Sequence, residues 1–148
     1  MPEVREPRLS TATCQTRPGH SRYHSAVAGP IVYVSHFRIK PGHEDEWWKM
    51  VDQVLPTLDA TKPRTAFQHF YLDETGTSVS IVHIFPDTEA VDLHMEGVSS
   101  RSQAALEFLE PIGFELYGKP TESFLASMGD MASLLRIEPT YVAGYDRF

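Results

Sequence analysis

The clearest structural signal in the sequence is an alternation of side chains over residues 31–39. One face of this segment is strongly apolar and the period is two, which is typical of a β-strand with one buried side. Pro41 and Gly42 break the strand. Apolar side chains then recur at helical spacing, at Trp47, Val51, Val54, Leu55 and Leu58. The sequence therefore predicts a strand and then an amphipathic helix, which should kink or end near Pro56 and stop by the loop at Lys62 and Pro63.

The middle of the chain predicts a hairpin followed by helices. Strands are expected at residues 65–72 and 78–85, because the short polar segment between them contains a glycine and suits a tight turn. Asp87 is expected to cap a helix that presents one apolar face. A capping-box pattern then predicts a further helical segment over residues 100–110.

The last third of the chain predicts a strand at residues 114–117, a helix capped by Thr121, and a final strand over residues 141–148. The complete order of elements is β-α-β-β-α-β, followed by an extra helix and strand. This order indicates an α+β fold of the ferredoxin-like type.

The first 29 residues differ from the rest, because they are rich in arginine and serine and contain no periodic apolar residues. We interpret residues 1–29 as a flexible or partner-clasping leader, with an organelle transit peptide as the alternative. Residues 30–148 form the predicted domain, and a total length of 148 residues agrees with a single domain.

Composition excludes several kinds of partner. Lys and Arg number 13 against 20 Asp and Glu, so the net charge of -7 has the wrong sign for a nucleic-acid-binding surface. The apolar runs are far shorter than the roughly 20 residues that span a bilayer, so no membrane partner is expected. Cys14 has no second cysteine with which to form an internal disulfide, which favours a reducing, cytoplasmic location.

Three segments carry a resemblance to a known family. They are the strand and Pro-Gly turn of residues 31–42, the strand, acidic cap and helix of residues 80–94, and the C-terminal segments 116–125 and 142–148. Together they resemble the antibiotic biosynthesis monooxygenase-like family of dimeric α+β barrels, over roughly residues 30 to 148.

The resemblance implies a homodimer in which two sheets pack together and each subunit keeps a small cavity between sheet and helices. Similar proteins include oxygenases that act on quinols and anthrone-like phenols without a cofactor, haem-degrading enzymes, and members with no known activity. The haem-degrading proteins use a strand asparagine and a helical tryptophan, where this chain has Ser35 and His94. That difference disfavours haem degradation, so no cofactor is expected.

Histidines are the residues best suited to chemistry in this sequence. An imidazole with an ordinary pKa near 6.5 can accept a phenolic proton and leave an electron-rich anion that reacts with dioxygen. His94 and His83 are therefore the candidate catalytic residues. The candidate substrate-binding residues are His69, Trp48, Tyr71 and Ser35. The histidine spacing does not fit a local pair of metal ligands, so no metal site is expected.

Two functions remain open from the sequence. The first is a monooxygenase-like enzyme that uses no cofactor and acts on a small aromatic molecule. The alternative is a non-enzymatic dimeric module that binds a small apolar ligand or is purely structural, with the histidines in packing roles. A pocket of about 300 Å³ or more with convergent histidines would favour the enzyme, whereas a solid interior would favour the module.

Overall fold

The computed structural model describes residues 29–145 of the chain. Its elements, in chain order, are β1 (Ile31–Ile39), α1 (Glu44–Thr61), β2 (Phe67–Leu72), β3 (Ser78–Phe85), α2 (Thr88–Met95), α3 (Val98–Ala105), β4 (Leu109–Tyr117), α4 (Glu122–Met128), a 3₁₀ turn η1 (Gly129–Leu134) and β5 (Leu135–Glu138). The leader predicted for residues 1–29 lies outside the described residues, apart from Gly29.

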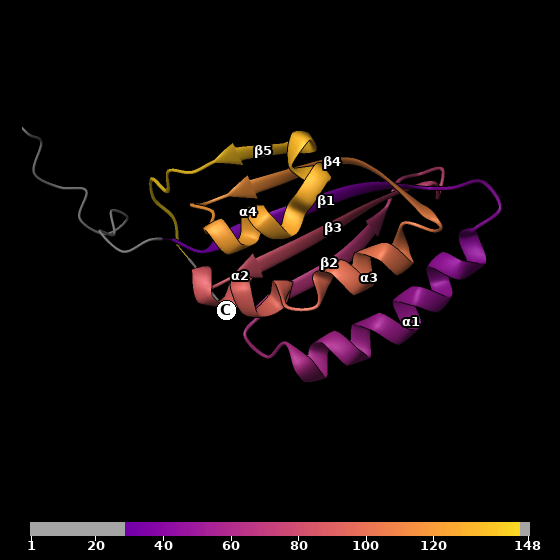
Figure 1. Cartoon of the computed structure of the whole chain (residues 1–148), viewed down its shortest axis with the longest axis horizontal. Helices are drawn as coiled ribbons and strands as arrows, with labels where there is room; N and C mark the ends of the chain where they lie inside the picture. The colour runs from indigo at the N-terminus through magenta and orange to yellow at the C-terminus, as the bar shows by residue number, and fades with distance from the viewer. Residues whose placement is uncertain (1–28, 146–148) are drawn as a thin grey trace, which may run out of the picture.

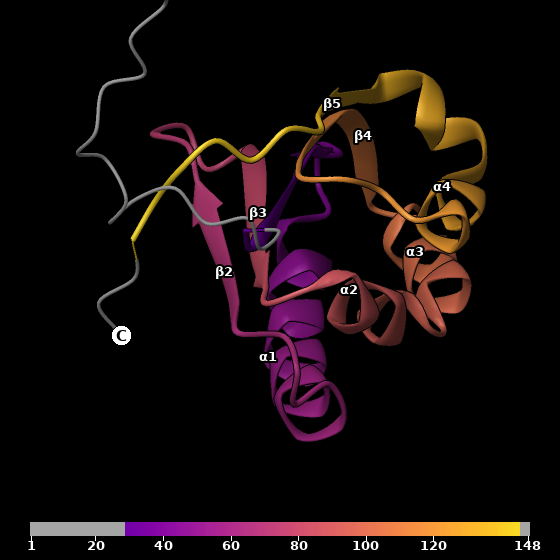
Figure 2. The same cartoon turned by 90° about the vertical axis from the view of Figure 1, so that its left-hand side faces the viewer.

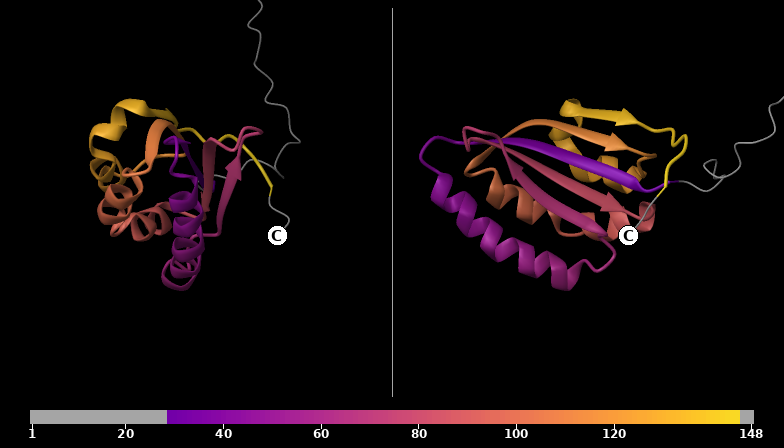
Figure 3. Two further views of the ribbon diagram at one scale, coloured as in Figure 1. Left: turned by 90° about the vertical axis from the view of Figure 1, so that its right-hand side faces the viewer. Right: turned by 180° about the vertical axis from the view of Figure 1, so that it is seen from behind.

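A single mixed sheet forms the frame of the molecule. Its strand order is β2-β3-β1-β4-β5, with antiparallel neighbours throughout except for the parallel pair β4 and β5. The helices lie together on one face of this sheet (Figures 1 and 2), and the view from behind shows the strands in front of them (Figure 3). The predicted ferredoxin-like arrangement with an extra C-terminal helix and strand is thus confirmed.

Alternation along β1 decides which side chains enter the core. Ile31, Tyr33 and Ser35 are buried beneath the helices, while the intervening side chains project from the opposite face, which we call the open face. The pairing of β1 with β4 shifts between His36 and Phe37, opposite Pro111. A proline cannot donate to the ladder, so it suits an irregularity of this kind.

Two apolar clusters make up the core on the helix-covered face. One joins the start of β1 to α2, α4 and the end of β4, and its residues without measurable exposure are Phe85 and Phe124. The other surrounds Trp47 of α1, which packs with Ile39, Val79 and Leu109. No helix in the described part of the chain combines the length and apolar character needed to cross a membrane.

Two predicted caps fix the helices that close the core. The Asp87 carboxylate accepts a hydrogen bond from the Ala90 N–H at 2.9 Å, and the Thr121 hydroxyl accepts one from the Phe124 N–H at 3.0 Å. Arg64 pairs with Asp87 from the opposite side. The start of α2 is therefore anchored, which positions the residues further along this helix.

Three boundaries differ from the sequence prediction. The helix predicted for residues 100–110 is α3, which ends at Ala105, and β4 already begins at Leu109. Gly97, with a φ of 74°, turns the chain at the end of α2 and allows α3 to start before the predicted cap. By contrast, α1 ends at Thr61, which agrees with the predicted stop at Lys62 and Pro63, and it includes Pro56 on an exposed side where the loss of one N–H is tolerated.

The predicted final strand is also misplaced. The strand is β5, at Leu135–Glu138, and residues 139–145 are not in a strand; residues 146–148 lie outside the described part. Pro139 follows β5 directly and has no N–H with which to continue the ladder. The segment then crosses the end of the sheet where β1 begins (Figure 1) and places Tyr141 over Gly29, where a Cβ atom would clash with the ring.

Candidate functional site

A cavity of about 320 Å³ lies between the sheet and the helices. Side chains from both core clusters contribute to its wall, and Phe37, which packs against both clusters, also lines it. The wall is mostly aliphatic and aromatic, and its polar members are Gln68, His83, His94, Arg101, Ser102 and Ser127. A mainly apolar cavity with a few polar groups is the usual form of a small-molecule site.

His83 enters the cavity wall from β3, opposite Tyr33 of β1. Its Nδ1 lies 3.3 Å from the backbone oxygen of Tyr33. A carbonyl oxygen can only accept, so Nδ1 carries the proton of the neutral ring and Nε2 keeps its lone pair. Burial lowers the pKa of His83 to about 4, so the ring is neutral at physiological pH.

His94 reaches the same place from α2. Its ring meets that of His83 edge to face, with centroids 4.9 Å apart and planes at 70°. Its Nδ1 lies 2.8 Å from the hydroxyl oxygen of Thr65. Burial, together with the positive charges of Arg101 and Lys62 and the neighbouring His83, lowers the pKa of His94 to about 3. The two imidazoles are therefore a neutral pair in the cavity wall.

Tyr33 and Arg101 provide hydrogen-bond donors near this pair. The Tyr33 hydroxyl contacts the sulfur of Met128 at 3.5 Å, and burial raises the pKa of Tyr33 to about 12, so it stays a phenol. Arg101 of α3 donates to the backbone oxygens of Glu96 and His94, each at 2.8 Å. Burial lowers the pKa of the Arg101 guanidinium. Because the ordinary pKa of arginine is very high, the group still stays charged.

The candidate residues from the sequence fall into two groups. His83 and His94 meet at the cavity, and Ser35 is buried on the same face of the sheet but does not belong to the cavity wall. His69 and Tyr71 lie on the open face, because β2 pairs with β3 so that Gln68, not His69, stands opposite His83. Trp48 is 53% exposed on α1. These last three residues are not brought to the cavity.

Sequence reasoning missed Tyr33, Gln68 and Arg101. Tyr33 lies on the same buried side of β1 as Ile31, so the alternation of side chains along this strand could have identified it. Gln68 and Arg101 had no such signal in the sequence. The position of Gln68 depends on which face of the edge strand β2 is turned toward the helices, and the position of Arg101 depends on the turn at Gly97.

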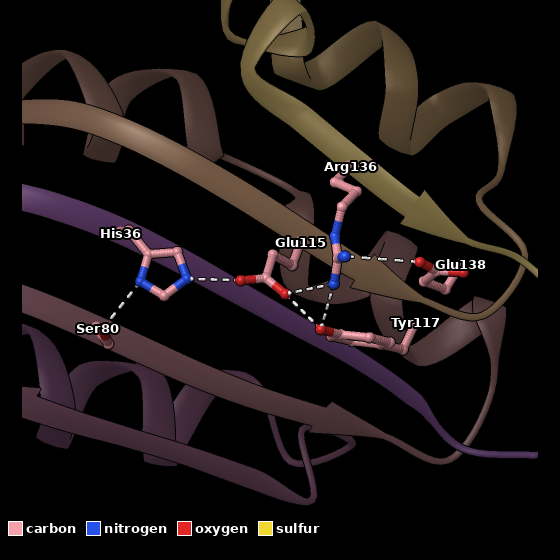
Figure 4. Close-up of polar contacts among 6 residues, drawn as sticks. All are labelled: His36, Ser80, Glu115, Tyr117, Arg136 and Glu138. Carbon is pink, nitrogen blue, oxygen red and sulfur yellow. Dashed lines mark hydrogen bonds and ion pairs between the residues drawn. The ribbon is translucent and has the colours of Figure 1, made fainter.

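A separate polar cluster lies on the open face (Figure 4). The His36 ring lies between the Ser80 hydroxyl, 2.9 Å from Nδ1, and the Glu115 carboxylate, 3.1 Å from Nε2. Arg136 of β5 also donates to Glu115, at 3.2 Å, and the hydroxyl of Tyr117 bonds the same carboxylate. Hydrogen bonding from these groups lowers the pKa of Glu115. The cluster ties β3, β1, β4 and β5 together across the open face.

Within residues 29–145, no three His, Cys, Asp or Glu side chains come close enough together to hold a metal ion. The acidic side chains of the described part stay out of the cavity wall, so its histidines have no carboxylate beside them there.

Comparison with known proteins places the fold. No family model and no curated protein matches the sequence. Among solved structures, MupZ from Pseudomonas fluorescens shares the fold with a TM-score of 0.59 and 16% identity, over 80% of this chain and 95% of its own. A Caulobacter crescentus protein, provisionally named an antibiotic biosynthesis monooxygenase, gives a TM-score of 0.54 and 15% identity, over 60% of this chain and 88% of its own.

Rv0793 from Mycobacterium tuberculosis matches in the same way, with a TM-score of 0.52 and 16% identity, over 64% of this chain and 98% of its own. Identities this low establish the fold and not the activity. The chain therefore has the fold of the antibiotic biosynthesis monooxygenase-like proteins, as the sequence resemblance predicts.

Proposed function

We propose that this protein is a monooxygenase-like enzyme that uses no cofactor and oxidises a small aromatic molecule, such as a quinol or an anthrone-like phenol. The observation that carries the proposal is an apolar cavity of about 320 Å³ with two neutral, edge-to-face histidines in its wall. This combination meets the criterion that separates an enzyme from a filled core. The Caulobacter crescentus protein of similar fold is named as a monooxygenase, which supports the same type of activity.

The reaction needs a base and an oxygen molecule. For an anthrone, the ring CH₂ becomes a second carbonyl: one atom of O₂ becomes the new carbonyl oxygen, and the other leaves as water with the two hydrogens lost from that carbon. The enzyme's task is to remove the first proton and so expose an electron-rich anion to dioxygen. We assign the lone pair of His83 Nε2 to this step, with the neighbouring His94 as the residue that receives or orients the same proton.

The lowered pKa values of the histidines set a condition on this step. A buried imidazolium is costly in the empty cavity, which is why the pKa of His83 is about 4. When the proton comes from a bound phenol, however, the imidazolium forms beside the phenolate. The attraction between the two charges is strong in apolar surroundings and offsets part of the cost of burying both. The step therefore favours substrates whose anion is held against the histidines.

Oxygen uptake tests the proposal directly. We expect the protein, treated with a chelator, to consume oxygen saturably with a panel of reduced quinols and anthrones, after subtraction of autoxidation. His94→Ala and His83→Gln should each lower kcat by about tenfold or more, because proton transfer by a positioned side chain usually contributes at least that much. His43→Ala, at the start of α1 and outside both the cavity wall and the open face, is the matched control and should leave kcat unchanged.

Uptake that is equal in the wild type and both cavity variants would remove the histidines from the mechanism. The alternative function, a binding module without turnover, is favoured by one observation: imidazoles with a pKa of about 3 to 4 are weak bases. That module would bind aromatic ligands in the cavity and consume no oxygen above background.

We also propose that the protein forms a homodimer through the open face of its sheet. Val32, Val34, Val82 and Ile84 project there from the central strands, with Phe67 and Tyr71 of β2 beside them. A partly exposed apolar sheet face next to a polar border is typical of an interface, and a second copy of this chain presents the same surface. The His36–Glu115–Arg136 cluster (Figure 4) supplies that border.

Sedimentation of matched variants checks this interface. Val34→Glu should convert a dimer to a monomer, because it places a carboxylate in the middle of the apolar face and beside Glu115, its neighbour in the ladder. Leu125→Glu introduces the same charge at an exposed position on α4 and should leave the dimer intact. A wild-type protein that sediments as a monomer at micromolar concentration would contradict the proposal.

A further inference from the structure

One charged side chain lies in the cavity wall, and the proposed oxidation chemistry makes no use of it. Arg101 is the only arginine or lysine among the described residues that line the cavity, and no Asp or Glu lines it. Arg101 is partly buried, so its charge is partly withdrawn from water, and an opposite charge beside it would offset that cost. Here the protein itself, within residues 29–145, supplies no ion pair for Arg101.

The hydrogen bonds of Arg101 leave capacity for a ligand. A guanidinium has five N–H donors. Only two of them meet an acceptor in the described part of the chain, the backbone oxygens of Glu96 and His94. These two bonds hold the head group at the C-terminal end of α2, next to the histidine that enters the cavity. The remaining donors are fixed in position before any ligand arrives.

We propose that the cavity binds an aromatic carboxylate and that Arg101 holds the carboxylate group. This inference rests on the proposed function, because it names the chemical class of ligand for the same cavity. Charge-assisted hydrogen bonds from a pre-positioned guanidinium are among the strongest that proteins make to a carboxylate. The apolar walls then accept the rings.

The electrostatics of the neighbouring residues agree with a negatively charged ligand. Arg101 and Lys62 both act on His94 as positive charges, in the direction that keeps its ring neutral. An anion at Arg101 would lower the cost of a positive charge on the adjacent imidazoles. Arg101 thereby selects the ligand, and the bound anion assists the proton transfer to a histidine. A cavity of about 320 Å³ is near the lower limit of small-molecule sites, which suits two or three fused rings.

A matched pair of ligands tests the charge preference without any turnover. 2-Naphthoate and 2-naphthamide have the same rings and nearly the same shape, but only the first is an anion at neutral pH. We expect the wild-type protein to bind 2-naphthoate at least tenfold more tightly, about 1.4 kcal/mol, by isothermal titration calorimetry. Arg101→Met should abolish the preference, and Arg101→Lys should keep part of it because the charge remains. Lys49→Met, an exposed lysine on α1, is the control and should not change the preference.

The outcomes separate this proposal from the enzymatic one. Equal affinity for both ligands, no measurable binding of 2-naphthoate at millimolar concentration, or a preference that survives in Arg101→Met would each overturn it. Because Arg101 also bonds the end of α2, Arg101→Met is checked for folding by circular dichroism; if it does not fold, Arg101→Lys and the wild-type pair decide. A preference for the anion without oxygen uptake would refute the monooxygenase and leave this proposal standing.

Discussion

Replacing Trp47 with alanine should lower the free energy of unfolding by about 3–5 kcal/mol, the usual cost of removing a large buried aromatic side chain. Trp47 is 1% exposed and packs against Ile39, Val79 and Leu109, with the Phe70 ring centroid 5.6 Å away. It joins α1 to the sheet, so its loss leaves a hole where helix and strands meet. Urea denaturation monitored by circular dichroism measures the change.

Trp48 provides a matched control one residue along the chain. It is 53% exposed, so Trp48→Ala should change the free energy of unfolding by no more than about 0.5 kcal/mol. Trp47→Phe gives a second comparison. The buried indole N–H of Trp47 has no acceptor among the described residues, so phenylalanine keeps much of the packing and removes an unpaired donor. If Trp48→Ala proves as costly as Trp47→Ala, the assigned orientation of α1 is wrong.

Residues with one clear periodicity could be predicted correctly from the sequence. In α2, the apolar stripe that includes Ala90, Val91 and Met95 is buried, and His94 is buried with it. A histidine at a core position of an amphipathic helix must face the sheet, so its place near the cavity follows from helical spacing alone. The same holds for Trp47, which begins the buried stripe of α1.

Residues on β2 could not be assigned to a face in this way. Phe67, His69 and Tyr71 form one side of the strand, and Gln68, Phe70 and Leu72 form the other, so both sides carry large apolar residues. The choice depends on the register with β3, which puts Phe70 opposite Ile81 and turns Gln68 toward the cavity. A shift of one residue would reverse it, and alternation in a single edge strand cannot exclude that shift.

Arg101 shows a different limit of sequence reasoning. Its position relative to His94 depends on the direction in which the chain leaves α2, and Gly97 sets that direction with a left-handed backbone conformation. The predicted helix begins at Ser100, whereas α3 begins at Val98, because the turn at Gly97 comes before the predicted cap. The number of residues between His94 and Arg101 does not show whether the two come into contact across this turn. Only the arrangement of α2 and α3 in space puts this cation in the cavity wall.

The neutral histidine pair should make the protein sensitive to mild acid. In the unfolded chain a histidine has a pKa near 6.5, whereas burial lowers the pKa of His83 to about 4 and that of His94 to about 3. Between these values the unfolded chain binds protons that the folded protein does not. Protons therefore favour unfolding, and stability is lost as the pH falls from about 6.5 toward the folded pKa values.

Lowering the pH from 8 to 5 should reduce the free energy of unfolding by about 2 kcal/mol for each histidine. The pair together should therefore reduce it by about 4 kcal/mol. His83→Gln/His94→Gln has no titrating group at these positions, and the difference between the two proteins isolates the pair because every other ionisable group is common to both. Carboxylates with a lowered pKa, such as Asp73 and Glu115, act mainly at lower pH and occur in both proteins. Urea denaturation of both proteins at pH 8 and pH 5 makes the measurement. Equal losses in the wild type and the double variant would mean that the cavity accepts protons freely, and the neutral pair on which the proposed proton transfer depends would not exist.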